Sequence, residues 1–193
     1  MIGLPPSRDV CSGVLSAEWD ELRTSGAARS APPPLVLFVS RLNTAVSIMA
    51  EAILRHLAQG RWRAASGGAL VASPAVSPFA MKCLHAHGIA TTGLHSKVWG
   101  EFFGIGKPPV RLLITLGEVY AAQADWPSDT LNVRWDTPDP AELVGSDVDL
   151  KLAFERAYRV LHARIQGFLS LEFGHLDDPA LLQALARIGE QST

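Results

Sequence analysis

An apolar run at residues 35–39, "LVLFV", followed by a short loop and a strongly patterned helix, constrains the fold of this chain more than any other feature. A short run without polar alternation is typical of a strand buried on both faces, as in parallel sheets. Further strands are expected near 62–66, 111–116 and 131–135, with helices between them. This alternation predicts an α/β fold, a three-layer sandwich in which a four-stranded parallel sheet carries helices on both faces.

The expected helices follow from apolar residues at helical spacing and from their end signals. The first begins after the loop with Thr44 as its cap, and the second begins at Ser77. Short helices are expected in "SKVWGEFF" and in "EVYAAQA", which follow residues 95 and 117. The longest covers residues 148–171 and has Leu152 on its apolar face, and the last covers 178–189.

These elements divide the chain into three parts. Residues 1–34 are an N-terminal extension and linker, 35–171 are the main domain, and 172–193 are a C-terminal helical extension. The last helix carries an apolar stripe and is too short to be stable alone, so the stripe must pack on something. It packs either on its own domain or on a second copy of the chain, which would give a homodimer.

Composition excludes several classes of protein. The chain has 193 residues, of which 48% are hydrophobic and 19% are charged, which is typical of a globular protein. A net charge of −2 gives no electrostatic case for nucleic acid or an anionic membrane. The start of the chain lacks the pattern of a secretion signal, so we expect a cytoplasmic protein. Two cysteines, Cys11 and Cys83, make no disulfide framework, and no cofactor is expected.

The order and spacing of several segments resemble the low-molecular-weight protein tyrosine phosphatases, most closely the thioredoxin-coupled arsenate reductases built on that fold. The resemblance runs from about Leu35 to Gly189 and rests on "AASGG", "SPFAMKCLHAHGI", "LLITL", "RWDTPDPAE" and "GSD". It implies a loop after the first strand with a cysteine, five variable residues, an arginine and a serine. The thiolate attacks phosphorus or arsenic, while loop N–H groups and the arginine bind the anion.

The resemblance implies an anion loop at residues 40–47 in which the catalytic side chains are missing. The cysteine position is Ser40, the arginine position is Val46, and the family's glycine is replaced by Leu42. At the positions of two further reductase cysteines, this chain has Gly117 and, by the same alignment, Ala124. The full loop consists of Ser40, Arg41, Leu42, Asn43, Thr44, Ala45, Val46 and Ser47, of which Asn43 and Ser47 match the family.

The remaining candidate residues each have a structural alternative. Ser40 is an alkoxide nucleophile only if a base lies beside it, and otherwise it is an inert loop residue. Asp139 matches the family's general acid, but Asp-Pro is also an ordinary turn pair. The histidines His85, His87 and His95 raise the question of a metal site, yet His85 and His87 are two apart on a helix and point away from each other. No metal site is therefore expected.

Two classes of function remain. In the first, the chain is a catalytically degenerate member of the arsenate reductase and phosphatase family, and acts as a non-enzymatic binding or regulatory protein. Its partner is then a protein or a second copy, and its loop N–H groups retain weak binding of an oxyanion such as phosphate or sulfate. In the second, it is a residual phosphatase or arsenate reductase-like enzyme acting on a small oxyanion or phosphoester. The missing thiols and arginine favour the first class.

Overall fold

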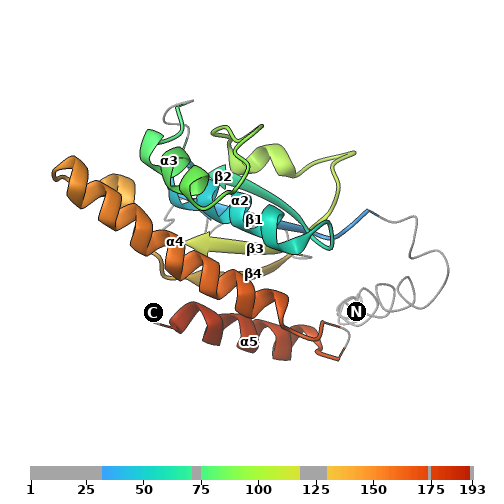
Figure 1. The fold of residues 1–193 in the computed structure, drawn as a ribbon. Coiled ribbons are helices and arrows are strands. Elements are labelled where there is room, and N and C mark those ends of the chain that lie inside the picture. Colours follow the sequence, from blue (N-terminus) through green and yellow to red (C-terminus); the bar gives the residue numbers. More distant parts are fainter. Residues whose placement is uncertain (1–31, 71–74, 118–129, 174, 192–193) are drawn as a thin grey trace, which may run out of the picture.

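The computed structural model describes residues 32–70, 75–117, 130–173 and 175–191 and contains the predicted sheet. Its four strands are β1 (Leu35–Ser40), β2 (Arg63–Gly68), β3 (Val110–Leu116) and β4 (Leu131–Trp135). All pairs are parallel, and the spatial order is β2-β1-β3-β4 (Figure 1). The prediction of an α/β fold with a four-stranded parallel sheet is confirmed. β1 is buried at all six positions, which explains its unbroken apolar sequence.

The helices lie close to their expected positions, but their starts differ in detail. They are α2 (Val46–Ala58), α3 (Pro78–Ala86), α4 (Asp147–Leu169) and α5 (Asp178–Glu190), with 3₁₀ helices η2 (Trp99–Phe102) and η4 (Pro140–Glu142). The expectation of Thr44 as a cap is wrong. The cap position of α2 is Ala45, and the Thr44 carbonyl instead accepts a hydrogen bond from the Ser77 N–H. Ser77 does precede α3, but its side chain makes no capping bond.

The two faces of the sheet are covered differently in the described part of the chain. Val36 and Phe38 point into the larger core, which the helices α2, α3, α4 and α5 close. Leu37 and Val39 point to the opposite face, where the η2 segment covers them with Trp99 and the phenylalanines that follow. Helical cover on the second face is thus a single short 3₁₀ helix, packed on β2.

The last helix packs on its own domain. Leu181, Leu185 and Ile188 of α5 are buried in the main core, and α5 lies beside α4 and against β4 (Figure 1). The Trp135 indole N–H of β4 donates a hydrogen bond of 3.0 Å to the Leu185 carbonyl. The apolar stripe is therefore used within the chain, and a dimer would need another surface.

The apolar face of α4 begins later than its sequence pattern indicates. Leu152 was expected to be buried, yet 52% of its surface is exposed, together with Val148 one turn earlier. Burial starts at Phe154, where α3 packs against α4. The expectation for Leu152 is wrong because the first turns of α4 extend beyond the domain.

Several expectations lie outside the described residues. These are most of the 1–34 extension with Cys11, the helix expected after Gly117, and Ala124. Within the described residues, no helix is long and apolar enough to cross a membrane.

Candidate functional site

The loop that links β1 to α2 lies at the carboxyl edge of the sheet, where open α/β sheets bind ligands. A cavity of about 720 Å³ opens there and is lined by residues at or just after the carboxyl ends of β1, β3 and β4. Its lining consists of Ser40, Arg41, Leu42, Thr44, Leu116, Gly117, Thr137, Asp139, Ala141 and Glu142. The structure therefore brings Ser40, Gly117 and Asp139 to one pocket, although they are far apart in the sequence.

The hydroxyl of Ser40 is buried and takes part in a neutral hydrogen-bond network. Its Oγ lies 2.7 Å from Ser47 Oγ and accepts the Asn43 N–H at 3.2 Å. The Asn43 amide nitrogen donates to Ser47 Oγ at 2.9 Å. Only 1% of Ser40 is exposed. Among the described residues, no histidine, lysine or carboxylate contacts this hydroxyl.

Asn43 also fixes the shape of the loop. Its φ of 53° is a left-handed conformation that asparagine adopts more readily than most residues. Its side-chain oxygen accepts the Lys97 N–H at 2.8 Å, which ties the loop to the segment before η2. Ser96 braces the same loop by donating to the Leu42 carbonyl. The loop is thus held in place without a ligand.

Val46 begins α2 and points into the core. Its side chain is fully buried among apolar residues and does not line the cavity. The position that the resemblance assigns to an anion-binding arginine is therefore an apolar packing position. Since α2 lacks a side-chain cap, the anion-binding groups left here are the N–H groups of its first turn.

Three charged side chains surround the cavity, and two of them are paired. Arg41 Nη2 lies 2.9 Å from Glu142 Oε1, so the loop's only charge is engaged with η4 across the cavity rim. Asp139 caps η4, where its Oδ1 accepts the Ala141 N–H at 3.0 Å. Arg41, Asp139 and Glu142 together give the lining a formal charge of −1 when all are ionised. Sequence patterns did not indicate Glu142, because this residue reaches the loop only through the turn at η4.

Burial raises the pKa of the Asp139 carboxyl, and the hydrogen bond from Ala141 only partly offsets this effect. A carboxyl that keeps its proton more readily can donate a hydrogen bond into the cavity. The geometry is therefore compatible with a general acid and equally with a capping residue of the turn.

Gly117 departs from a cysteine in its backbone as well as in its side chain. Its φ is 73°, and a Cβ built there would lie 3.3 Å from the Thr137 carbonyl oxygen. Residues other than glycine are strained in this conformation. The structure thus has a glycine-specific turn where the resemblance implies the second reductase cysteine.

Cys83 does not supply a nucleophile to this cavity. It lies on α3, outside the lining of the cavity. Burial, with a smaller contribution from the Glu155 charge, raises the pKa of its thiol to about 11. A thiol of this kind is almost entirely protonated near neutral pH and is a poor nucleophile.

Comparison with known proteins supports the resemblance. Residues 35–104 match the family described as low molecular weight phosphotyrosine protein phosphatase. No curated protein sequence matches the chain. Similar solved structures include an arsenate reductase in the phosphate-binding state, with 23% identity and a TM-score of 0.55 over 71% of this chain and 97% of that one.

Two further structures have the same fold. A low-molecular-weight protein tyrosine phosphatase from T. tengcongensis has 21% identity and a TM-score of 0.57, over 70% of this chain and 97% of that one. The YwlE arginine phosphatase, as a mutant with a phosphorylated active-site serine, has 20% identity and a TM-score of 0.52, over 73% and 99%. Together with the family match over residues 35–104, these likenesses confirm the predicted resemblance and show that the chain has the fold of the low-molecular-weight phosphatases and arsenate reductases.

Proposed function

We propose that this chain is a non-enzymatic binding protein of the cytoplasm, which keeps the fold and pocket of the family without its chemistry. The observation that carries the proposal is the state of the loop. Ser40 is buried in a neutral hydrogen-bond network, and Val46 is part of the core.

A serine hydroxyl needs an adjacent base to become a nucleophile. The groups that contact Ser40 Oγ in the described structure are the Ser47 hydroxyl and the Asn43 N–H, and neither accepts a proton at neutral pH. An oxyanion that bound Arg41 would also have to displace the Glu142 carboxylate with which Arg41 is paired. Both requirements of phosphoryl or arsenate chemistry, a nucleophile and an anion clamp, are therefore unmet.

The charge of the cavity also opposes an oxyanion. Asp139 and Glu142 face the same space as Arg41, which leaves no excess of positive side chains. Loop N–H groups still favour an anion, but each neutral hydrogen bond contributes only about 0.5–1.5 kcal/mol net. We therefore expect phosphate and sulfate to bind weakly.

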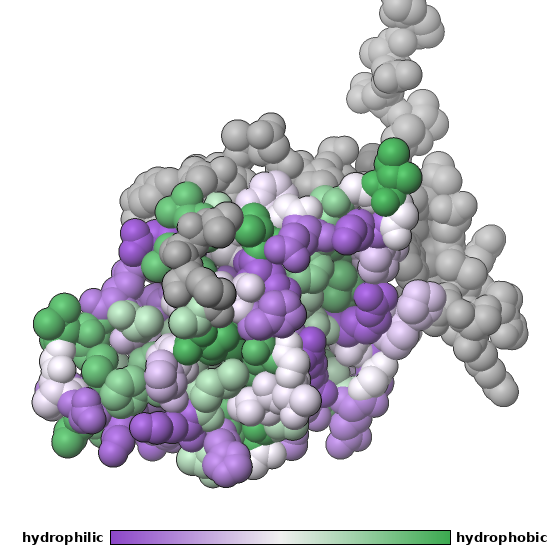
Figure 2. Space-filling model, turned by 90° about the horizontal axis from the view of Figure 1, so that it is seen from above, coloured by the Kyte–Doolittle hydropathy of each residue, from purple (hydrophilic) through white to green (hydrophobic). Residues whose placement is uncertain are grey.

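An exposed apolar surface beside the cavity supports a protein as the partner. It consists of Leu143, Val144, Val148 and Leu152, all at least 46% exposed, in the segment that runs from η4 into α4. Figure 2 shows hydrophobic residues gathered at the left end of the molecule, where α4 begins. Exposed apolar patches of neighbouring residues are typical of interaction sites. The patch and the cavity rim would then contact the same partner.

Assays of the purified protein test the loss of catalysis. We expect no hydrolysis of an aryl phosphate and no thioredoxin-coupled reduction of arsenate. Ser40→Ala is the matched control, because it removes the hydroxyl and leaves the loop backbone in place. Turnover in the wild type that Ser40→Ala abolishes would contradict the proposal.

Binding is tested separately by amide NMR with phosphate, arsenate and sulfate. We expect small, unsaturated shifts in the loop of residues 40–47. The double variant Ser40→Cys/Val46→Arg, once circular dichroism has verified its fold, serves as the positive control, since it returns the two family side chains to one loop. Tight saturable binding by the wild type would instead favour an oxyanion ligand as the function.

One comparison favours an alternative. The arginine phosphatase mutant shows that an active-site serine in a protein of this fold can carry a phosphoryl group. A residual phosphatase that forms a phosphoserine at Ser40 is the second candidate. Intact-mass spectrometry after incubation with an aryl phosphate distinguishes the two, because only this candidate predicts one added phosphoryl group that Ser40→Ala removes.

A further inference from the structure

A second group of chemically active side chains lies between α3 and α4. Cys83 is on α3, His87 is the residue at its carboxyl end, and Glu155 is on the facing side of α4. His87 Nε2 lies 3.1 Å and 3.0 Å from the two oxygens of Glu155. Cys83 Sγ lies 3.8 Å from Glu155 Oε2, and all three ligand atoms are within 4.8 Å of one another.

These separations are close to those that a tetrahedral metal ion imposes. Zinc binds sulfur at about 2.3 Å and nitrogen or oxygen at about 2.0–2.1 Å, which places tetrahedral ligand atoms about 3.3–3.8 Å apart. The largest separations in the cluster involve the Cys83 sulfur, so binding an ion would draw this sulfur closer to the other two ligand atoms. Cys83 and His87 are also four residues apart, which puts them on one face of the helix.

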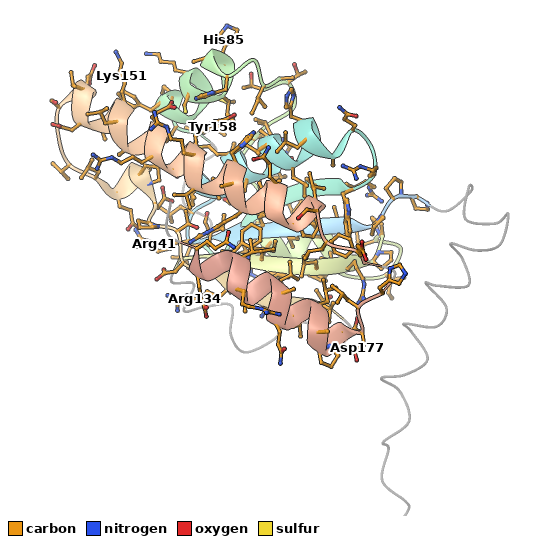
Figure 3. All side chains as sticks on the ribbon, turned by 60° about the horizontal axis from the view of Figure 1, so that its bottom comes forward. Arg41, His85, Arg134, Lys151, Tyr158 and Asp177 are labelled. Atoms are coloured by element: carbon orange, nitrogen blue, oxygen red, sulfur yellow. The ribbon has the colours of Figure 1, made fainter. Side chains whose placement is uncertain are left out.

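The surroundings hold the three side chains in this arrangement. The Tyr158 ring stacks on the His87 imidazole, with ring centroids 3.7 Å apart and an interplanar angle of 10°. Tyr158 lies one turn after Glu155 on α4, whereas His85 points away from the molecule at the tip of α3 (Figure 3). About a third of the His87 and Glu155 side chains is exposed, so an ion can enter and a water molecule can complete its coordination.

We propose that Cys83, His87 and Glu155 form a binding site for a zinc-like divalent cation that links α3 to α4. A thiolate, an imidazole and a carboxylate match zinc or cobalt, whereas calcium and magnesium prefer oxygen ligands alone. Three protein ligands with a solvent-exposed fourth position leave one coordination site free. This inference is independent of the proposed function, because the cluster lies outside the cavity of residues 40–47.

Cobalt spectroscopy on the metal-free protein tests the site. The background is Cys11→Ser, which leaves Cys83 as the only thiol. We expect one equivalent of Co²⁺ to give a thiolate-to-cobalt charge-transfer band, and Zn²⁺ to abolish that band by displacement. In this background Cys83→Ser should remove the band, and His87→Gln and Glu155→Gln should weaken Zn²⁺ binding by more than about 100-fold, because loss of a supporting contact alone costs about 10–100-fold.

His85→Gln is the matched control, since it removes an exposed histidine from the same helix without touching the cluster. It should leave Zn²⁺ affinity unchanged, and circular dichroism of each metal-free variant verifies its fold. As a second readout, Zn²⁺ should raise the melting temperature of the wild type and of His85→Gln only. The proposal is overturned if no charge-transfer band forms, or if Cys83→Ser binds Zn²⁺ as tightly as its background. It is equally overturned if His85→Gln is the variant that loses binding.

Discussion

Two helical glycines, Gly167 where α4 meets α5 and Gly189 where α5 meets β4, should respond to alanine in opposite directions. A Cβ built at Gly189 of α5 lies 2.5 Å from Trp135 Cδ1 and 3.0 Å from the Arg134 carbonyl oxygen. Trp135 is fully buried, and its indole N–H is bonded to α5, so the ring has no room to move. At Gly167 of α4, the nearest atoms belong to Ile188 and lie 3.5–3.7 Å away, which is ordinary van der Waals contact.

The magnitudes follow from two competing effects. Replacing glycine by alanine within a helix stabilises it by about 0.5–1 kcal/mol. Overpacking a core costs about 1–3 kcal/mol. Gly167→Ala therefore raises the free energy of unfolding by about 0.5–1 kcal/mol. Gly189→Ala lowers it by about 1–2 kcal/mol, since the steric cost exceeds the gain near the end of the helix. In a chain of this size each kcal/mol corresponds to about 2–4 °C in melting temperature.

Urea unfolding followed by tryptophan fluorescence measures both variants against the wild type. Gly167→Ala is the control for helix propensity, because both substitutions add one methyl group to a helix. A gain in stability for Gly189→Ala similar to that for Gly167→Ala would refute the packing of α5 on Trp135. The apolar stripe of α5 would then be free to contact a second copy of the chain, as the homodimer hypothesis requires.

Three further substitutions test the structure around the candidate site. Lys97→Met should lower the free energy of unfolding, measured by urea unfolding, because it removes an ion-pair partner of the fully buried Glu51. The expected loss is about 3 kcal/mol, the low end for breaking a buried ion pair, since Glu51 keeps its other partners. Gly117→Ala should cost about 1–2 kcal/mol in the same assay, since the φ of Gly117 is left-handed. The control is Gly93→Ala, because Gly93 has a similar φ of 78° but no atom within 4 Å of an added Cβ. An equal or larger loss for Gly93→Ala would show that the Thr137 carbonyl beside Gly117 adds nothing to the cost. Asp139→Asn should stabilise the protein at neutral pH but not below about pH 3.8. The pKa of Asp139 is raised in the folded state, so the wild type loses stability as the pH rises from 3.8 through that raised pKa. Equal pH dependence of the melting temperatures of the variant and the wild type across this range would contradict the reasoning.

The sequence was most informative where local pattern and burial coincide. The strand β1 was predictable because a parallel strand buried on both faces is apolar along its whole length. The position of the anion loop followed from that strand and from the family resemblance. Helix ends were less predictable, because the Thr44 carbonyl is bonded to Ser77 in a contact across 33 residues that local rules do not include.

Features made by distant residues were not predictable from the sequence. The stripe of α4 includes Leu152 by its spacing, but spacing does not show where the neighbouring elements end. The pair of Arg41 and Glu142 depends on the turn at η4, which brings residues about 100 positions apart into contact. His87 is a further example, because sequence reasoning considered it as a metal ligand only together with its neighbour His85. Its relevant neighbours are Cys83, four residues earlier, and a carboxylate on α4.

The resemblance implies two activities, phosphoryl transfer and arsenate reduction, and the structure places different obstacles before each. At Ser40, which the resemblance aligns with the nucleophilic cysteine, a hydroxyl stands in place of a thiol, so one atom distinguishes the two side chains. At Val46 the change is larger, because the side chain has become part of the core and an arginine must leave it to reach the cavity. At Gly117 the backbone itself is left-handed, and a cysteine there would be strained before it could react. Arsenate reduction needs a relay of thiols. On our proposal, a return to that chemistry would require a change of backbone at Gly117, whereas a return to anion binding at the loop would require changes of side chains alone.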